Sequence, residues 1–373
     1  MVTREIDPVE DLLAYADPET PLAWLRRGDG IVAVGAGMPT FVRVSSRSCA
    51  PHADAISKAW QQIVATADID DPVGLPGTGL VAFGALTFDD DSAADSVLIV
   101  PSTVIGRSHG RSWITTITNG SDAPEVIEPR AYGPHWAGTL GPGAQSAQGY
   151  QDSVCAGLDA IAAGEVSKVV LARDLTGSVP AGADLRRLVR ALSTEYPDTW
   201  AFAVDGLMGA SPETLVTVQD GTITARVLAG TTARGADADA DTVASVALAS
   251  SEKDIDEHQY AVQSVLTALR PHTRAMASSE QPFLLKLPNL FHLATDVEGE
   301  LSDGSTSLDL VGALHPTAAV AGTPTPAAIA AIRRLEPFDR ERYAGPVGWV
   351  DASGNGEWAI ALRCAQFLSL IHI

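Results

Sequence analysis

Two apolar runs joined by Asp220 and Gly221 are the feature that most constrains how this chain can fold. Residues 214–230 read TLVTVQDGTITARVLAG, and an Asp-Gly pair between two such runs is a strong signal of a two-residue β-hairpin. A second hairpin is predicted over residues 342–366, with its turn at residues 354–356. Hairpins need antiparallel strands, so any sheet that contains these segments is antiparallel at least in part.

Helices are predicted among these strands. Apolar residues at helical spacing mark residues 149–164, 184–196 and 325–335, and a longer helix is predicted to begin at Ser251. Hairpins and helices without regular βαβ alternation indicate an α+β fold, an α/β sandwich of large antiparallel β-sheets with packed helices.

The amino-terminal part of the chain differs in character from the rest. Its first 145 residues are short apolar runs separated by Gly, Pro, Ser and Asp, which predicts short strands and many turns. The turn-rich stretch 132–150 is the best candidate for a boundary. We therefore divide the chain into residues 1–146, residues 147–366 and a tail, residues 367–373.

The charge balance excludes some classes of function. Asp and Glu total 46 against 25 Lys and Arg, which gives a formal net charge of -21. Nucleic-acid binding needs a basic stripe, and none is visible in the sequence. An anionic substrate would need a local cluster of Lys or Arg, because the overall field repels it.

The cysteines and the apolar stretches point to the cytoplasm. Cys49, Cys155 and Cys364 are isolated, so neither a disulfide framework nor a zinc site is predicted. The acidic N-terminal residues lack the apolar segment that a signal peptide contains. No apolar run approaches the 18 residues that a membrane-spanning helix needs. We expect a soluble, cytoplasmic protein with no membrane contact.

Asp254 and Glu257 lie three positions apart in the helix predicted from Ser251, so their side chains share one face. Acidic residues near a helix N-terminus commonly face water and favour the helix dipole, and Asp254 follows Ser251 at capping-box spacing. The alternative is a carboxylate platform for Mg²⁺, which takes oxygen ligands. Spacing alone leaves both interpretations open.

Lys168 and Glu213 are candidate acid–base residues. Lys168 lies in residues 167–175, SKVVLARDL, which are predicted to form a buried strand. Its amine can reach the surface, as lysines usually do, or become a base if it is desolvated. Glu213 follows a proline turn and can be an exposed carboxylate or a general acid. The 45 residues between the two do not indicate whether they meet.

Two loops contain further candidates. In residues 228–235, LAGTTARG, Gly230 and Thr231 stand at the end of a predicted strand, where backbone N–H groups can approach an anion. A plain turn is equally compatible. His315 and Thr317 precede a predicted helix, whose N-terminus can receive a carboxylate, but a lone histidine in such a position is more often structural.

Taken together, these segments resemble the chorismate-utilising enzymes of the anthranilate synthase component I type, and most closely the isochorismate synthases. The matching stretches keep the family's order over residues 147–366 and read SKVVLARDL, ASPETLV, LAGTTARG, SSEKDIDEHQYAVQSVL, FHLATDVEGEL, LHPTAAVAGTPTPAAI, RRLEPFDRERYAGPVGW and GNGEWAIALRCAQ. The resemblance implies one domain with large antiparallel sheets around a buried site, and no obligate protein partner. It also implies a Mg²⁺-dependent reaction in which water adds at C2 of chorismate and the 4-hydroxyl leaves.

The resemblance further implies a role for each candidate residue. Lys168 would activate water as the base, and Glu213 would protonate the departing hydroxyl. Glu257 would bind Mg²⁺, with Asp254 supporting the metal site. The residues expected to line the site and bind substrate are Gly230, Thr231, His292, Ala319 and Arg363. Of these, Arg363 would supply positive charge for a substrate carboxylate.

Two features bear on the branch of the family and on the end of the chain. Ala319 stands where the branches that form aminated products or salicylate tend to have Thr, which favours isochorismate synthase over salicylate or anthranilate synthase. Beyond about Gln366 the family continues into a helix, a Gly-rich strand and a final helix with an ExxE pair of Mg²⁺ ligands, none of which follows here. We therefore expect a chain truncated at its C-terminus. An inactive or merely ligand-binding relative stays an open alternative.

Overall fold

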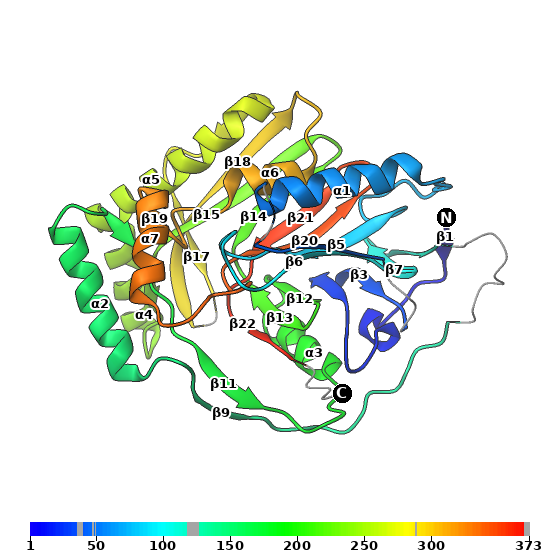
Figure 1. Cartoon of the computed structure of the whole chain (residues 1–373), viewed down its shortest axis with the longest axis horizontal. Coiled ribbons are helices and arrows are strands. Elements are labelled where there is room, and N and C mark those ends of the chain that lie inside the picture. Colours follow the sequence, from blue (N-terminus) through cyan, green and yellow to red (C-terminus); the bar gives the residue numbers. More distant parts are fainter. Residues whose placement is uncertain (36–39, 47, 49, 118–126, 288, 369–373) are drawn as a thin grey trace.

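Two antiparallel β-sheets packed face to face form the body of the molecule (Figure 1). Helices cover the outer faces of both sheets. The predicted α+β fold with large antiparallel sheets is thereby confirmed. The computed structural model describes residues 1–35, 40–46, 48, 50–117, 127–287 and 289–368.

The smaller sheet combines strands from both ends of the chain. Its order is β1 (Val2–Ile6), β8 (Arg111–Thr116), β7 (Thr103–Ser108), β3 (Asp29–Ala33), β2 (Ala23–Arg26), β12 (Trp200–Val204), β13 (Leu207–Ser211) and β22 (Cys364–Gln366). Strands from either side of residue 146 thus share one sheet.

The larger sheet is built in the same way. Its order is β16 (Thr273–Ser278), β18 (Leu290–Leu301), β15 (Thr222–Ala233), β14 (Thr214–Gln219), β21 (Gly356–Ile360), β20 (Pro346–Asp351), β5 (Val81–Ala85), β6 (Ser96–Val100) and β4 (Thr40–Val44), and β17 (Phe283–Lys286) also pairs with β18. Two ribbons stand apart from the sheets, β10 (Lys168–Val169) with β19 (Gly322–Thr323) and β9 (Thr139–Pro142) with β11 (Leu175–Ser178).

The helices form outer layers. The larger sheet is covered by α1 (His52–Thr66), α5 (Glu252–Leu269) and α6 (Ser307–Leu314), and the 3-10 turn η2 (Arg270–His272) continues α5. The smaller sheet packs against α3 (Arg186–Glu195) and the 3-10 turn η1 (Leu12–Tyr15). Near the ribbon of β10 and β19 lie α2 (Ala147–Ala162) and α7 (Thr325–Leu335), and β15 and β17 contact α4 (Ala238–Ala249).

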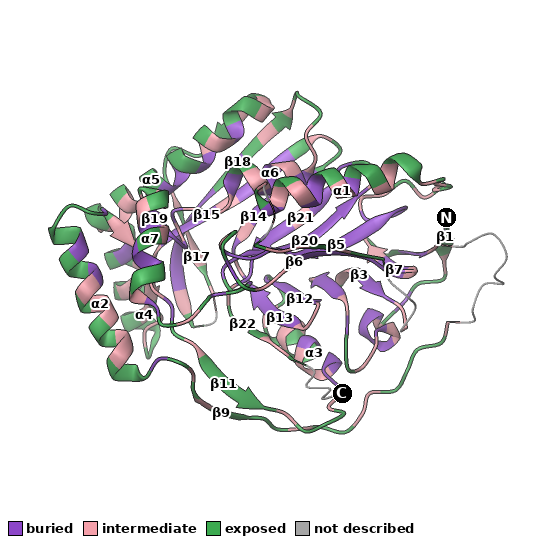
Figure 2. Ribbon diagram, viewed as in Figure 1, coloured by how far each residue is buried: buried purple, intermediate pink, exposed green. Residues whose placement is uncertain are grey.

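One core lies between the two sheets, and a larger one lies between the larger sheet and the helices that cover it. Trp24, Trp113 and Phe202 of the smaller sheet pack with Phe83 and Trp349 of the larger one, and all are almost completely buried. Figure 2 shows that buried residues run through both sheets, whereas the helices are buried only on their inner sides. Burial of this apolar surface, at about 25 cal/mol per Å², is the main force that holds the sheets together.

The first predicted hairpin is confirmed. Gln219 of β14 pairs with Thr222 of β15, so the turn has two residues. Both turn residues, Asp220 at φ 50° and Gly221 at φ 80°, have the positive φ that such turns require. The second hairpin is confirmed as the antiparallel pair of β20 and β21.

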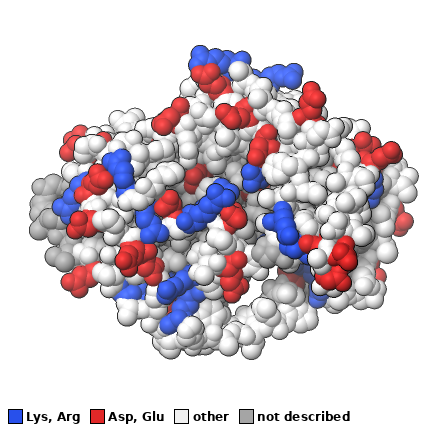
Figure 3. Space-filling model, turned by 180° about the vertical axis from the view of Figure 1, so that it is seen from behind, with Lys and Arg blue, Asp and Glu red and all other residues white. Residues whose placement is uncertain are grey.

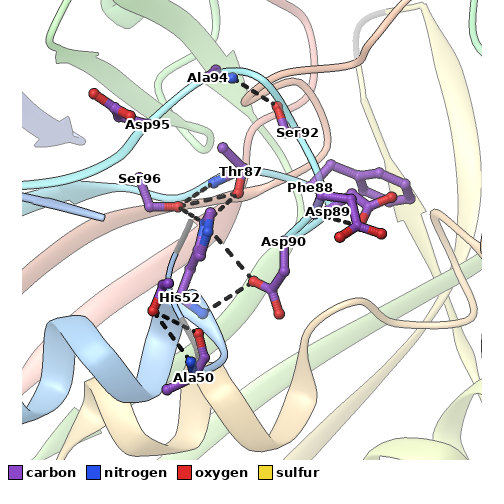
Figure 4. Close-up of polar contacts among 12 residues, drawn as sticks. Ala50, His52, Thr87, Phe88, Asp89, Asp90, Ser92, Ala94, Asp95 and Ser96 are labelled. Atoms are coloured by element: carbon purple, nitrogen blue, oxygen red, sulfur yellow. Dashed lines mark hydrogen bonds and ion pairs between the residues drawn. The ribbon is translucent and has the colours of Figure 1, made fainter. Parts of the chain in front are cut away.

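Helix α1 was not predicted from the sequence. Residues from elsewhere in the chain hold its N-terminus by hydrogen bonds (Figure 4). Its N-cap, Pro51, has no side-chain hydrogen bond, and the backbone N–H of His52 donates to Asp90 Oδ1 at 3.0 Å. The buried His52 imidazole places Nδ1 3.0 Å from Thr87 Oγ1 and 2.9 Å from Ser96 Oγ. A cap supplied by such distant residues leaves no local signal in the sequence.

Two predicted strands differ from the structure. Residues 167–175 pair as β10 only at Lys168 and Val169, which are half-buried, so the prediction of a long buried strand is wrong. The strand expected through Arg363 is interrupted after Ile360, because the chain leaves the larger sheet and rejoins the smaller one as β22. Arg363 takes a left-handed conformation, φ 51°, at this change of sheet.

Other expectations concern the membrane and the tail. Among the described residues, none of the helices is long and apolar enough to span a membrane. In the predicted tail, the Phe367 backbone N–H donates to Gly206 O at 2.8 Å. Residues 369–373 and Cys49 lie outside the described residues.

Gly84 of β5 offers a test of the packing against α6 and its neighbours. A methyl group at Gly84 would overlap the indole of Trp358, which is fully buried in β21. We expect Gly84→Ala to lower the free energy of unfolding by about 1–3 kcal/mol through overpacking, measured by urea denaturation. The control is Gly141→Ala in the exposed strand β9, where the added methyl meets nothing within 4 Å. Equal stability of the two variants would contradict this packing.

Candidate active site

A cavity of about 270 Å³ gathers most of the predicted site residues. Those that line it are Lys168, Glu213, Gly230, Thr231, Glu257, His292, Ala319 and Arg363. Apolar groups that the sequence did not single out complete the lining, namely Val170, Pro212, Leu228, Ala229 and Leu362. A more open hollow of about 310 Å³ lies over η2 and β16, and its described lining holds none of the predicted site residues.

Two passages of the chain between the sheets form one wall of the cavity. Residues 211–213 lead from β13 to β14, and residues 361–363 lead back from β21 to β22. The passages lie side by side, since Ile360 N–H donates to Glu213 O at 3.1 Å and Ser211 Oγ donates to Ile360 O at 2.6 Å. This pairing brings the carboxyl of one passage and the arginine of the other to the same cavity.

A bulge in β15 shapes the opposite wall. The register between β15 and β18 shifts between Ala229 and Thr231. Gly230, at the bulge, has φ 81°, a conformation that residues with a side chain rarely adopt. Beyond it, Thr231 pairs with His292, and Thr231 Oγ1 lies 2.7 Å from His292 Nδ1.

Helix α5 presents Glu257 to the cavity, and the next residue fixes the helix in place. The buried His258 has Nδ1 3.2 Å from Ala229 O and Nε2 2.8 Å from Thr295 Oγ1. Burial lowers the pKa of His258, so a neutral ring donates to the carbonyl and accepts from the hydroxyl. Sequence reasoning missed this role, although a histidine beside Glu257 on the sheet-facing side of the helix was its signal.

Lys168 and Glu257 form an ion pair within the cavity. Lys168 Nζ lies 2.6 Å from Glu257 Oε1, with about 26% and 34% of the two side chains exposed. Such a half-exposed pair is partly screened by water and is worth little to stability. The candidate base and the candidate metal ligand are therefore in direct contact.

Glu213 is the most deeply buried acid of the site. Burial raises its pKa to about 7, and the positive charge of nearby Lys168 lowers it only in part. A carboxyl group with this pKa is about half protonated at pH 7, so it can donate a proton there. The predicted alternative of an exposed carboxylate is excluded by its burial.

His292 is neutral in this setting. Burial lowers its pKa to about 4, and the nearby Arg363 guanidinium adds to the effect. Its Nε2 is buried and, among the described residues, has no hydrogen-bond partner. Since a buried polar atom is normally paired, this nitrogen is available to a ligand in the cavity.

Asp254 stands behind the cavity wall and is not among the described lining residues. Its backbone N–H donates to Ser251 Oγ at 3.3 Å, as the predicted helix cap requires. Its Cβ packs against Gly230, where a methyl group would lie 3.3 Å from it. In the part of the chain that the structure describes, no group of three or more His, Cys, Asp and Glu side chains could hold a metal ion.

His315 has a structural position. It ends α6 instead of preceding a helix, because α7 begins only at Thr325. Its Nε2 lies 3.0 Å from Phe88 O, and burial lowers its pKa to about 4. His315 therefore ties α6 to the loop after β5.

Charges of both signs are intermixed on the surface. On the face shown in Figure 3, Lys and Arg side chains alternate with Asp and Glu and form no continuous basic band. Lys168 and Arg363 of the cavity are thus local positive charges in a chain of net charge -21.

Comparison with known sequences identifies relatives. The isochorismate synthase DhbC of Bacillus subtilis (strain 168) is 41% identical over 229 residues, which are 58% of this chain and 58% of that protein, less than two thirds of its length. The salicylate biosynthesis isochorismate synthase of Pseudomonas aeruginosa is 30% identical over an alignment of 398 positions, gaps included, that covers 97% of this chain and 80% of that protein.

Comparison of structures and of families completes the assignment. MenF, the menaquinone-specific isochorismate synthase from Escherichia coli, is similar in fold, with a TM-score of 0.75 at 24% identity over 97% of this chain and 85% of that one. The family model described as "Chorismate binding enzyme" matches residues 138–369, more than half of the chain. Together with the cavity described above, this match establishes that the chain belongs to the chorismate binding enzyme family.

Proposed function

We propose that this protein is an isochorismate synthase, which adds water at C2 of chorismate and removes the 4-hydroxyl with the help of Mg²⁺. The observation that carries the proposal is that Glu213, a buried carboxyl with a raised pKa, and Lys168 line one cavity. Similarity to the enzymes of B. subtilis and P. aeruginosa supports the choice of substrate and reaction.

In this proposal Glu213 is the general acid. With a pKa of about 7, its protonated form is well populated at neutral pH and gives its proton to the departing hydroxyl. Lys168 is the general base that takes a proton from the attacking water. Its nitrogen can do so only as a neutral amine, so the ammonium that pairs with Glu257 at 2.6 Å must first give up a proton.

The remaining polar and small residues of the cavity are assigned to substrate binding. Arg363 can form a two-pronged pair with a substrate carboxylate. The unpaired Nε2 of His292 and the bulge at Gly230 and Thr231 offer further polar contacts. Ala319, a small residue in the lining, leaves room beside the substrate.

The cavity offers a carboxylate that could bind Mg²⁺. Mg²⁺ is usually held by one or two carboxylates together with substrate oxygens and water, and Glu257 is a half-exposed carboxylate in the lining. Glu257 would be the ligand, and Asp254 would support it from one helical turn earlier. When bound, the ion would supply positive charge next to an anionic substrate.

The assigned roles predict the effect of removing either catalytic group. We expect Lys168→Ala and Glu213→Gln each to lower kcat by about 10²–10⁴-fold, measured as isochorismate formed from chorismate with Mg²⁺. Lys253→Ala, at an exposed position of α5, is the matched control and should keep full activity.

The outcomes separate the alternatives. Retained activity in both variants would refute these roles, and a wild-type protein without turnover would refute the proposed function. Salicylate or anthranilate as the product would place the enzyme in another branch of the family.

The raised pKa of Glu213 also predicts how stability depends on pH. Because the folded pKa, about 7, lies above the ordinary 4.5, ionisation of the buried carboxyl disfavours folding between these values. Relative to Glu213→Gln, the free energy of unfolding of the wild type should fall by about 1.4 kcal/mol per pH unit between them and level off outside. Urea denaturation at a series of pH values measures this, and parallel curves would show that Glu213 has an ordinary pKa.

The assignment of Glu257 predicts metal binding directly. Glu257→Gln should weaken Mg²⁺ binding by about tenfold or more, because an ionised ligand is lost, as measured by titration calorimetry in the presence of chorismate. Asp256→Asn, at the exposed neighbouring position, is the control and should bind as the wild type does. Unchanged affinity in Glu257→Gln would exclude it as a ligand, and chelation of Mg²⁺ should stop turnover.

A further inference from the structure

A buried ion pair lies behind the wall that carries Lys168. Glu336, at the end of α7, and Arg340 are joined by Arg340 Nη2 to Glu336 Oε1 at 2.6 Å and by Nε to Oε2 at 2.8 Å. Only about 3% of the Arg340 side chain and 1% of the Glu336 side chain are exposed. The guanidinium also stacks over Phe88, 4.4 Å from the ring centre; Figure 4 shows Phe88 beside Thr87, in the loop after β5.

The remaining hydrogen bonds of this pair hold two segments of the cavity wall. Arg340 Nη2 donates to Val170 O at 2.7 Å, and Nη1 donates to Val320 O at 2.9 Å. Val170 lines the cavity, and Val320 follows Ala319, which also lines it. On the acid, Glu336 Oε1 accepts from the backbone N–H of Ala172 at 2.7 Å.

These bonds replace a missing strand partner. Lys168 and Val169 pair with β19, and Val170 N–H still donates to Ala321 O at 3.0 Å. Beyond that point regular pairing ends, and the ion pair accepts from Ala172 N–H and donates to Val170 O instead. The ion pair therefore fixes the backbone of residues 170–172, where regular strand pairing has ended.

Stability alone does not account for such a pair. Removing two charges from water costs several kcal/mol per ion, and apolar residues of similar volume often stabilise a fold as well or better. The geometry of the pair points to a positioning role instead, since a guanidinium holds its donors in a fixed planar fork and so fixes the groups that accept from it.

We propose that Glu336 and Arg340 are positioning residues that set the course of residues 168–172 and so hold the Lys168 amine in register with the Glu213 carboxyl. This inference rests on the proposed function. The pair touches no substrate and acts through the backbone of the wall. Its loss should therefore reduce the rate of the chemical step more than the binding of substrate by Arg363.

A near twin elsewhere in the molecule provides the control. Arg186 is also buried, pairs with Asp184 at 2.7 Å and donates to the backbone oxygens of Ala14, Arg130 and Ala131. It stacks on Tyr132, 4.8 Å from the ring centre. None of these described residues lines the cavity.

The test compares Arg340→Lys with Arg186→Lys in the full chain. Lysine keeps the charge but loses the fork, so both variants should lower the melting temperature. We expect Arg340→Lys to lower kcat by about 10²-fold with little change in KM, as a misplacement of about 1 Å does, and Arg186→Lys to keep kcat near the wild-type value. Glu336→Gln still accepts from Ala172 N–H and should show a smaller loss of kcat. It replaces Arg340→Lys in the test if that variant does not fold.

Amide hydrogen exchange gives a readout that needs no activity. Exchange at residues 170–172 should become faster in Arg340→Lys and Glu336→Gln and stay unchanged in Arg186→Lys. Unchanged exchange there, or equal losses of kcat in the Arg340 and Arg186 variants at equal loss of stability, would overturn the inference. If the wild type does not convert chorismate, the proposed function fails, and the exchange data alone decide whether the pair positions this segment.

Discussion

The face-to-face packing of the two sheets is the constraint on which the site depends. Their shared core of Trp, Phe and branched side chains fixes the sheets against each other, so the places where the chain passes between them are fixed too. Two such passages, residues 211–213 and 361–363, run side by side, because Ile360, just before the second, is hydrogen-bonded to the first. Each delivers one functional side chain, Glu213 or Arg363, to the same cavity. The site is thus a product of sheet packing, which makes it rigid.

Local charges, not the net charge, decide what this cavity can bind. The chain is strongly acidic, yet Lys168 and Arg363 face the cavity, and burial raises the pKa of Glu213, the most buried acid there, to about 7. An anionic substrate therefore meets positive charge within the site. The buried pair of Glu336 and Arg340 extends this arrangement by one layer, since it holds the backbone behind Lys168.

Local signals predicted part of the fold, whereas the choice of site residues came from the family resemblance. The Asp220-Gly221 turn and the Ser251 cap determine a hairpin and a helix start through short-range geometry, and both are found. The sequence could not show that Lys168 and Glu213 meet, because that depends on the sheets. Nor could it show that α1 starts at His52, whose N–H donates to Asp90. The long strand expected through Lys168 was wrong because Arg340 and Glu336, not a neighbouring strand, hold residues 170–172.

The account centres on a protonated Glu213 beside Lys168. The most direct test is the infrared difference spectrum of the wild type minus Glu213→Gln, followed from pH 5 to pH 9, in which the protonated carboxyl band of a single residue can be titrated. The account predicts that this band is lost with a midpoint at about pH 7, where about half of it remains. A midpoint near the ordinary value of 4.5 would show that the carboxyl is ionised in the folded protein, and would contradict the account.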